Sequence, residues 1–158
     1  MVGLGYDCHK IIDGNGLFIG GVFIPCEYSF LAHSDGDVLL HSLCDALLGA
    51  SGCGDIGEYF PDNDLKFKDK ESSYFVKEVI KLLSAKKYKI VNIDCTLILE
   101  RPKLSPYKNE IKDNIAKLCK LNPSQVNIKA KTSEKMGFVG RMEGIEAFTI
   151  CELKETDV

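Results

Sequence analysis

Residues 91–100, VNIDCTLILE, decide the class of fold that this chain adopts. Apolar side chains occupy the odd positions from Val91 to Leu99, and mostly polar ones occupy the even positions. This period of two predicts a strand that buries one face in a core. Because helical patterns lie on both sides of the strand, the chain is predicted to be an α+β domain.

Three stretches carry apolar side chains at helical spacing. Residues 37–50 form the first and follow an Asp-Gly-Asp sequence that can cap a helix, and residues 75–83 form the second. The third covers residues 107–118, with Ser105 as the predicted N-cap and Pro106 as the first helical residue. The chain is therefore predicted to contain three long helices.

Strand patterns flank these helices. Residues 2–9 favour a short strand, and residues 17–24 favour a hairpin whose turn is Gly20-Gly21. Residues 126–130 and 145–153 alternate between apolar and polar side chains. The predicted order is β-β-β-α-α-β-α-β-β, which indicates a mixed sheet with helices on one face.

The last predicted strand carries apolar side chains on both of its faces. Phe148 and Ile150 lie on the face opposite to Ala147 and Cys151, since neighbouring residues of a strand point in opposite directions. If helices cover only one face of a sheet, apolar side chains on the other face are exposed to water unless something else covers them. The pattern predicts that the open face packs against another subunit.

Length and composition exclude several classes of protein. The 158 residues fit one domain, 1–158, and 45% hydrophobic with 27% charged residues is the balance of a globular protein. No apolar run approaches the ~20 residues that cross a bilayer, and neither a membrane partner nor a retained signal peptide is expected. A net charge of -3 argues against a nucleic acid partner.

Seven cysteines, at positions 8, 26, 44, 53, 95, 119 and 151, are odd in number and contain no C-x-x-C pair. Such spacing is typical neither of a disulfide framework nor of a structural zinc site. We expect free thiols in a reducing compartment.

The three histidines, His9, His33 and His41, all lie in the first 41 residues. Asp7 and His9 are two residues apart on a predicted strand, so their side chains share a face and can bind one ion, with His41 as a third ligand. Two imidazoles and a carboxylate leave one position of a tetrahedral Zn²⁺ open, as in catalytic zinc sites. The alternative is a surface His9 and a hydrogen-bonded core His41.

Polar stretches before and after the first helix are candidates for ligand binding. Ser34 and the backbone that leads into the helix can bind a phosphate, or serve only to cap the helix. Residues 52–57 match G-x-G-x-x-G by letter but follow a helix rather than a strand, which excludes a dinucleotide site. Asp55, Gly57 and the acidic loop 60–64 can instead meet sugar hydroxyls, or be solvated turn residues.

Two later loops carry charged and hydroxyl groups. Residues 100–104 follow the long strand and include Lys103, which can meet a phosphate. Residues 131–138 offer hydroxyls, a carboxylate and ammonium groups, a mixture that suits Mg²⁺ and phosphate oxygens. Ordinary solvated loops are the competing interpretation. Spacing alone therefore leads no further than a metal-dependent enzyme that acts on a phosphorylated small molecule.

Six motifs, in order along nearly the whole chain, resemble those of one known family. They are GYDCH at 5–9, IGGV at 19–22, HSDGDVLLH at 33–41, DIGEYFPD at 55–62, RPKL at 101–104 and TSEKMGF at 132–138. The chain is similar in these motifs to the 2-C-methyl-D-erythritol 2,4-cyclodiphosphate synthases of the non-mevalonate isoprenoid pathway. Arg101, where a small residue is expected, and Met142, where glycine is usual, depart from the family pattern.

The resemblance implies a homotrimeric lyase with active sites at the boundaries between subunits. The implied substrate is 4-diphosphocytidyl-2-C-methyl-D-erythritol 2-phosphate, whose 2-phosphate attacks the β-phosphorus, releases CMP and closes a cyclic diphosphate. The implied location is the cytoplasm of a bacterium, or the plastid or apicoplast of a eukaryote.

The resemblance also implies roles for individual residues. Asp7, His9 and His41 would hold Zn²⁺, Glu134 would hold Mg²⁺ or Mn²⁺, and His33 and Thr132 would stabilise the transition state. The implied substrate-binding residues, of which 99–105 come from a neighbouring subunit, are Ser34, Asp55, Gly57, Phe60, Asp62, Asp64, Leu99, Glu100, Arg101, Pro102, Lys103, Leu104, Ser105, Ser133, Phe138 and Arg141. Arg141 would line the threefold axis.

Two other functions stay open at this point. A zinc-dependent phosphohydrolase would release a linear product formed with water. A trimer that binds isoprenoid phosphates without catalysis would show affinity and no turnover.

Overall fold

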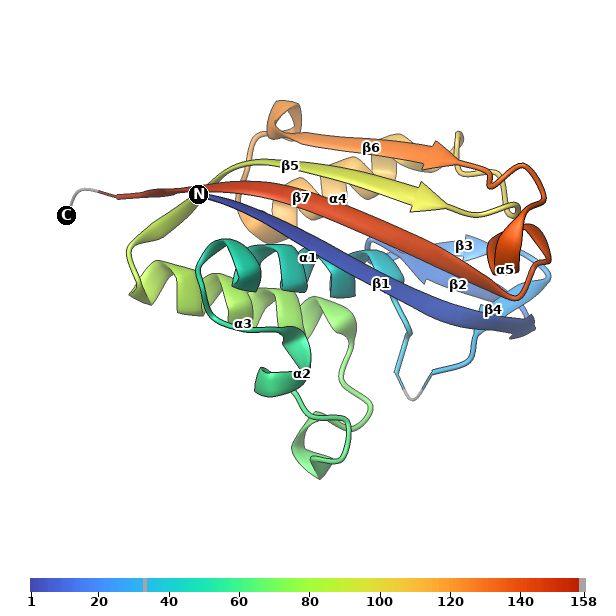
Figure 1. Ribbon diagram of the computed structural model, residues 1–158, viewed down its shortest axis with the longest axis horizontal. Coiled ribbons are helices and arrows are strands. Elements are labelled where there is room, and N and C mark those ends of the chain that lie inside the picture. The colour runs from blue at the N-terminus through green and yellow to red at the C-terminus, as the bar shows by residue number, and fades with distance from the viewer. Residues whose placement is uncertain (33, 157–158) are drawn as a thin grey trace.

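The computed structural model describes residues 1–32 and 34–156 (Figure 1). Its elements are β1 (Val2–Asp13), β2 (Gly16–Ile19), β3 (Val22–Pro25), β4 (Tyr28–Phe30), α1 (Val38–Ala50), α2 (Ile56–Tyr59), η1 (Leu65–Phe67), α3 (Ser72–Ala85), β5 (Tyr88–Ile98), α4 (Lys108–Cys119), η2 (Pro123–Gln125), β6 (Val126–Lys131), α5 (Gly137–Gly140) and β7 (Gly144–Glu155). Among these residues, no helix is long and apolar enough to cross a membrane. All seven cysteines are free thiols.

Five strands form one mixed sheet in the order β4-β1-β7-β5-β6. The long strands β1 and β7 are antiparallel, from Val2 opposite Glu152 to Lys10 opposite Gly144. Strand β5 pairs antiparallel with β7 and parallel with β6, as expected where helix α4 connects two neighbouring strands. The predicted mixed α+β sheet is confirmed, and the hairpin β2–β3 forms a separate two-stranded sheet.

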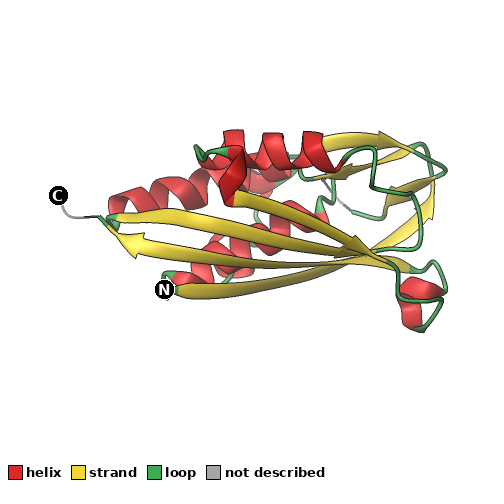
Figure 2. Cartoon of the chain, turned by 90° about the horizontal axis from the view of Figure 1, so that it is seen from above, coloured by secondary structure: helices red, strands yellow, loops and turns green. Residues whose placement is uncertain are grey.

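The long helices α1, α3 and α4 cover one face of this sheet (Figure 2). Helix α1 lies against β1 and β7, and its side chains from Val38 to Leu40 are completely buried. On the sheet itself, the alternation in β5 puts Ile93, Cys95 and Leu97 into the same core. The period of two in this strand and the helical period in α1 therefore meet in one apolar layer.

Two glycines let α1 approach β1 without a layer of side chains between them. A Cβ atom at Gly3 would overlap the carbonyl oxygen of Ala46, and one at Gly5 would overlap that of Ser42. Any side chain at these positions would push the helix away from the strand. The contact brings His41, beside Ser42, close to Asp7, which is two residues after Gly5.

Several predicted boundaries differ from those of the structure. Strand β1 runs on to Asp13 because its end pairs with β4, a strand of three residues that is too short to show a periodic pattern. Helix α4 begins at Lys108 with Tyr107 as N-cap, so the prediction of Ser105 as cap and Pro106 as first helical residue is wrong. The amide of Tyr107 bonds to the carbonyl of Leu104, and residues 105–107 form a turn before the helix.

The sheet face opposite the helices carries an apolar stripe, here called the outer stripe. It comprises Val2, Leu4, Tyr6, Phe148 and Ile150, of which Leu4 is 62% and Ile150 48% exposed. Leu4 lies opposite Ile150 and Tyr6 opposite Phe148 in the register of β1 and β7, and the two aromatic ring centroids are 4.9 Å apart. The expected apolar character of both faces of β7 is therefore present.

Candidate functional site

Asp7 and His9 on β1 and His41 on α1 bring three ligand atoms together. Nε2 of His9 lies 3.1 Å from Nδ1 of His41, and each of these nitrogens lies 3.2 Å from Oδ2 of Asp7. The side chains are 25%, 22% and 18% exposed in chain order, so the cluster is sheltered but open to solvent. The sequence prediction that these residues meet is confirmed.

The geometry of this cluster suits a metal ion. In a tetrahedral zinc site with bonds of about 2.05 Å, neighbouring ligand atoms lie about 3.3 Å apart. Hydrogen bonds satisfy the arrangement poorly. If both nitrogens donate to Asp7, two N–H groups face each other at 3.1 Å, and if one nitrogen is unprotonated, its lone pair faces the carboxylate oxygen of Asp7 at 3.2 Å. A cation bound by all three atoms removes this conflict, and the ligand set leaves a fourth position for an oxygen of a substrate.

The two imidazoles have opposite pKa shifts. Burial lowers the pKa of His9, and the charge of Asp7 only partly opposes this effect. Burial also lowers the pKa of His41, but the hydrogen bond to Asp7 and the charge of Asp7 raise it above its ordinary value overall. Asp7 therefore interacts more strongly with His41, whereas His9 is kept in the neutral form that binds metals.

Behind His41 lie two residues that sequence analysis did not assign to the site. The hydroxyl of Ser72, completely buried at the start of α3, lies 2.9 Å from Nε2 of His41. The same hydroxyl donates to Oδ1 of Asp35, and the amide of Ser72 donates to Oδ2 of Asp35 at 2.9 Å. No spacing links Ser72 to His41 in the sequence, because the packing of α3 against α1 creates the contact.

The loop before α1 holds the predicted phosphate-binding residues. Ser34 is half-buried, and the predicted His33 lies outside the described residues. Asp37 caps the helix: its Oδ1 accepts from the amides of Leu40 and Gly20, and its Oδ2 accepts from that of Gly21. This carboxylate therefore ties the start of α1 to the β2–β3 turn.

The segment 55–64 combines exposed carboxylates with an aromatic anchor. Asp55 caps the short helix α2 by accepting from the amide of Glu58, and Asp64 caps η1 by accepting from that of Lys66. Phe60 packs on Phe75 of α3, with ring centroids 4.8 Å apart. The predicted residues Gly57 and Asp62 are exposed in the same segment.

The loop 132–136 is held by a carboxylate at the end of the long strand. Oε1 of Glu100 accepts from the amide of Ser133 at 3.0 Å, the hydroxyl of Ser133 at 3.1 Å and the amide of Lys135 at 3.1 Å. These bonds, that of Lys135 first, lower the pKa of Glu100 below 4.5. Between the two amides, Glu134 has a φ of 55° and Lys135 one of 61°, in the left-handed region. Thr132 and Glu134 are exposed.

The remaining predicted residues divide into exposed and buried ones. The side chains of Leu99 and Leu104 are buried in the core, and Pro102 is half-buried. Arg101, Lys103 and Ser105 are exposed.

Arg141 forms two hydrogen bonds with Glu143, from Nε at 3.2 Å and from Nη2 at 3.1 Å. Beside this pair lies a cavity of about 500 Å³ that includes Phe138, Glu143 and His9 in its lining. The cavity joins the predicted residue Phe138 to the back of the metal-binding strand.

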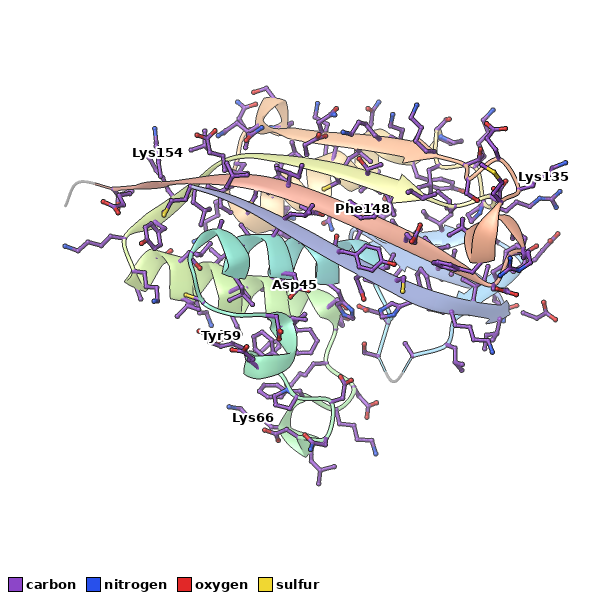
Figure 3. The ribbon with its side chains drawn as sticks, in the orientation of Figure 1. Asp45, Tyr59, Lys66, Lys135, Phe148 and Lys154 are labelled. Atoms are coloured by element: carbon purple, nitrogen blue, oxygen red, sulfur yellow. The ribbon has the colours of Figure 1, made fainter. Side chains whose placement is uncertain are left out.

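One chain does not bring all of these groups together. Figure 3 places Tyr59 and Lys66, which mark the segment 55–67, below α1 and α3, and Lys135 at the far end of the sheet. Among the described residues, Glu134 is not part of the cluster of Asp7, His9 and His41. The single chain therefore carries two separate parts of the predicted site.

Known proteins match the chain along its whole length. The model of the YgbB family matches residues 1–154. A 2-C-methyl-D-erythritol 2,4-cyclodiphosphate synthase from Caldicellulosiruptor bescii is 53% identical over 154 residues, covering 96% of this chain and 98% of that protein.

Two solved structures have the same fold. One, 2C-methyl-D-erythritol-2,4-cyclodiphosphate synthase in a CDP-bound form, is 35% identical with a TM-score of 0.91, and the match covers 98% of this chain and 100% of that chain. The other, the bifunctional IspDF from Campylobacter jejuni, is 41% identical with a TM-score of 0.94 over 99% of this chain, which spans 42% of that larger one. The chain therefore belongs to the YgbB family, as one of its 2-C-methyl-D-erythritol 2,4-cyclodiphosphate synthases, and is an enzyme.

Proposed function

We propose that the chain, acting as one domain, converts 4-diphosphocytidyl-2-C-methyl-D-erythritol 2-phosphate to the 2,4-cyclodiphosphate and releases CMP, as a lyase of the non-mevalonate isoprenoid pathway. The 2-phosphate attacks the β-phosphorus, and the bond between that phosphorus and the bridging oxygen of CMP breaks. The observation that carries the proposal is the convergence of Asp7, His9 and His41 on one point. The CDP in a related structure supports a cytidine substrate.

Asp7, His9 and His41 are proposed to hold Zn²⁺, and Glu134 to hold Mg²⁺ or Mn²⁺. The bound cations would offset the repulsion between two phosphate groups and polarise the phosphorus that is attacked. The protein contributes position: the attacking phosphate belongs to the substrate itself, so no side chain has to act as nucleophile. His33, Ser34 and Thr132 would donate hydrogen bonds to the phosphate oxygens as charge develops on them.

A second copy of the chain would complete this site. Within one chain, Tyr59 and Lys66 of the segment 55–67 lie far from Lys135 of the loop 132–136 (Figure 3), and among the described residues Glu134 is not part of the metal-binding cluster. In the proposed homotrimer the loops 99–105 and 132–138 of one subunit would face the cluster of the next, with Lys103 beside the CMP phosphate. The outer stripe supplies the apolar surface for such an assembly, since in the single chain Phe148 is half-buried and its other four residues are exposed.

The trimer leads to a prediction for Ile150, at the centre of the outer stripe. Replacing it with lysine puts a charge where apolar side chains of three subunits would meet, and we expect the protein to become monomeric and inactive. Sedimentation would report the assembly and CMP release the activity. The variant Phe18→Lys, at an apolar residue of β2 that is 40% exposed against 48% for Ile150, should stay trimeric. A trimeric, active Ile150→Lys variant would contradict the proposed interface.

The loop 132–136 leads to a prediction for Glu100. In the variant Glu100→Ala the amides of Ser133 and Lys135 lose their acceptor, and misplacement of Glu134 and Thr132 should lower turnover up to ~100-fold with little change in Tm. Because folding lowers the pKa of Glu100, the contribution of these bonds is present above pH 4.5 and is lost as the pH falls through the folded pKa. Hydrogen exchange of the two amides below pH 4.5 would report the loss. Unchanged turnover in the variant would show that Glu100 does not position the loop.

The reaction is tested by incubating the protein with the diphosphocytidyl substrate, Zn²⁺ and Mg²⁺, and identifying the products by mass spectrometry. Equal amounts of CMP and a cyclic diphosphate are expected. A linear product, heavier by one water, would establish hydrolysis instead. Binding of the substrate without products would favour a binding protein.

A further inference from the structure

We infer that Ser72 and Asp35 are positioning residues that orient His41 for metal binding. The inference rests on the proposed metal centre and concerns the side of the imidazole that faces away from it. It starts from the tautomer of His41. Nδ1 faces Asp7 and His9, so Nδ1 must offer its lone pair to a metal, and the proton of a neutral ring must then lie on Nε2.

The hydroxyl oxygen of Ser72 is placed to accept a hydrogen bond from the Nε2–H group of His41. This oxygen lies 2.9 Å from Nε2 of His41, and its own hydrogen points to Oδ1 of Asp35. Each group in the chain from His41 through Ser72 to Asp35 thus donates once to the next. The direction is fixed at its far end, because a carboxylate can only accept.

Asp35 is itself held in place from two sides. The amide of Ser72 donates to its Oδ2 at 2.9 Å, and the amide of Asp37 donates to its Oδ1 at 3.1 Å. These bonds join the starts of α1 and α3 around one carboxylate. Since Ser72 is completely buried, no water can replace its hydroxyl without a rearrangement of α3.

The arrangement fixes the ring of His41 in the tautomer and rotation that a metal requires. An acceptor that hydrogen-bonds the N–H of a ligating imidazole also makes the other, unprotonated nitrogen a stronger electron-pair donor to the metal. Loss of such an acceptor typically weakens metal affinity 10- to 100-fold. Neither Ser72 nor Asp35 belongs to the ligand set of Asp7, His9 and His41.

The test measures zinc affinity by competition with a chromophoric chelator, together with the visible spectrum of the Co²⁺ form, which reports ligand geometry. In Ser72→Ala we expect zinc affinity to fall ~10- to 100-fold and the Co²⁺ spectrum to change. Ser72→Thr, which keeps the hydroxyl, should restore most of the affinity. Asp35→Asn, which removes the charge and one acceptor, should weaken binding in the same direction.

The matched control is Ser42→Ala. Ser42 is also a completely buried serine, on α1, but its hydroxyl bonds to Thr149 at 2.7 Å and not to a metal ligand. Its loss should leave zinc affinity and the Co²⁺ spectrum unchanged. Equal weakening in Ser42→Ala and Ser72→Ala, or tight zinc binding that Ser72→Ala does not change, would overturn the inference alone. Absence of zinc binding in the unsubstituted protein would overturn the metal centre and the inference together.

Discussion

Replacing His41 with alanine is expected to abolish both zinc binding and product formation. The imidazole is the only one of the three ligands that comes from a helix, and without it Asp7 and His9 form a two-point site on one strand. Without the cation, the transition state of a reaction between two phosphates loses several kcal/mol of electrostatic stabilisation, which corresponds to a loss of turnover of roughly 1,000-fold or more. Metal content and CMP release would be measured on the same preparation.

Control measurements must show that the loss of zinc binding and turnover in His41→Ala is caused neither by unfolding nor by the removal of a charged group as such. Thermal unfolding and sedimentation of His41→Ala should match those of the unsubstituted protein freed of metal. Asp7→Ala should behave as His41→Ala does, whereas Asp13→Ala, which removes an exposed carboxylate at the end of the same strand, should keep full activity. Turnover within tenfold of normal in His41→Ala would contradict the assignment of this cluster to catalysis.

Replacing Asp37 with alanine is expected to give the largest loss of stability. The side chain is completely buried and accepts hydrogen bonds from the amides of Gly20, Gly21 and Leu40. Loss of a helix cap together with unpaired buried amides should lower the free energy of unfolding by about 3 to 4 kcal/mol. Urea unfolding followed by circular dichroism would measure the change.

Two variants show whether burial is the cause. Asp37→Ser keeps a capping oxygen for Leu40 but cannot reach both glycine amides, so we expect an intermediate loss. Asn122 caps the exposed η2, and Asn122→Ala should cost less than about 1 kcal/mol because water can pair with the freed amides. If Asp37→Ala lowered the free energy of unfolding no more than Asn122→Ala does, the link between α1 and the β2–β3 turn would not contribute to stability.

Much of the architecture could be predicted because its elements are long and periodic. The alternation in residues 91–100 identified β5, and the helical stripes identified α1, α3 and α4. Strand β4 and helices α2 and α5 were missed, since three or four residues do not complete a pattern. The error at Ser105 has a related cause: residue type suggests a helix start, but the turn at Leu104 sets where the helix begins.

The metal-binding cluster could be predicted because two of its ligands share one face of a strand. The spacing of Asp7 and His9 places their side chains together whatever the rest of the chain does. The contact of Ser72 with His41 follows only from the packing of α3 on α1, and no local pattern encodes that packing. The same holds for the loop 132–136, whose shape depends on Glu100, more than thirty residues earlier.

The bare contact between α1 and β1 has a consequence for how this sequence can vary. At Gly3 and Gly5 the two backbones touch, so the span from Asp7 to His41 does not depend on the volume of any side chain between them. Elsewhere in the core, replacing one apolar residue by another of different volume displaces the helix that packs on it. In this protein, such a displacement of α1 would leave its contact with β1 at Gly3 and Gly5, next to the ligands, in place. Substitutions among apolar residues deeper in the molecule should therefore change the dimensions of the metal-binding cluster little.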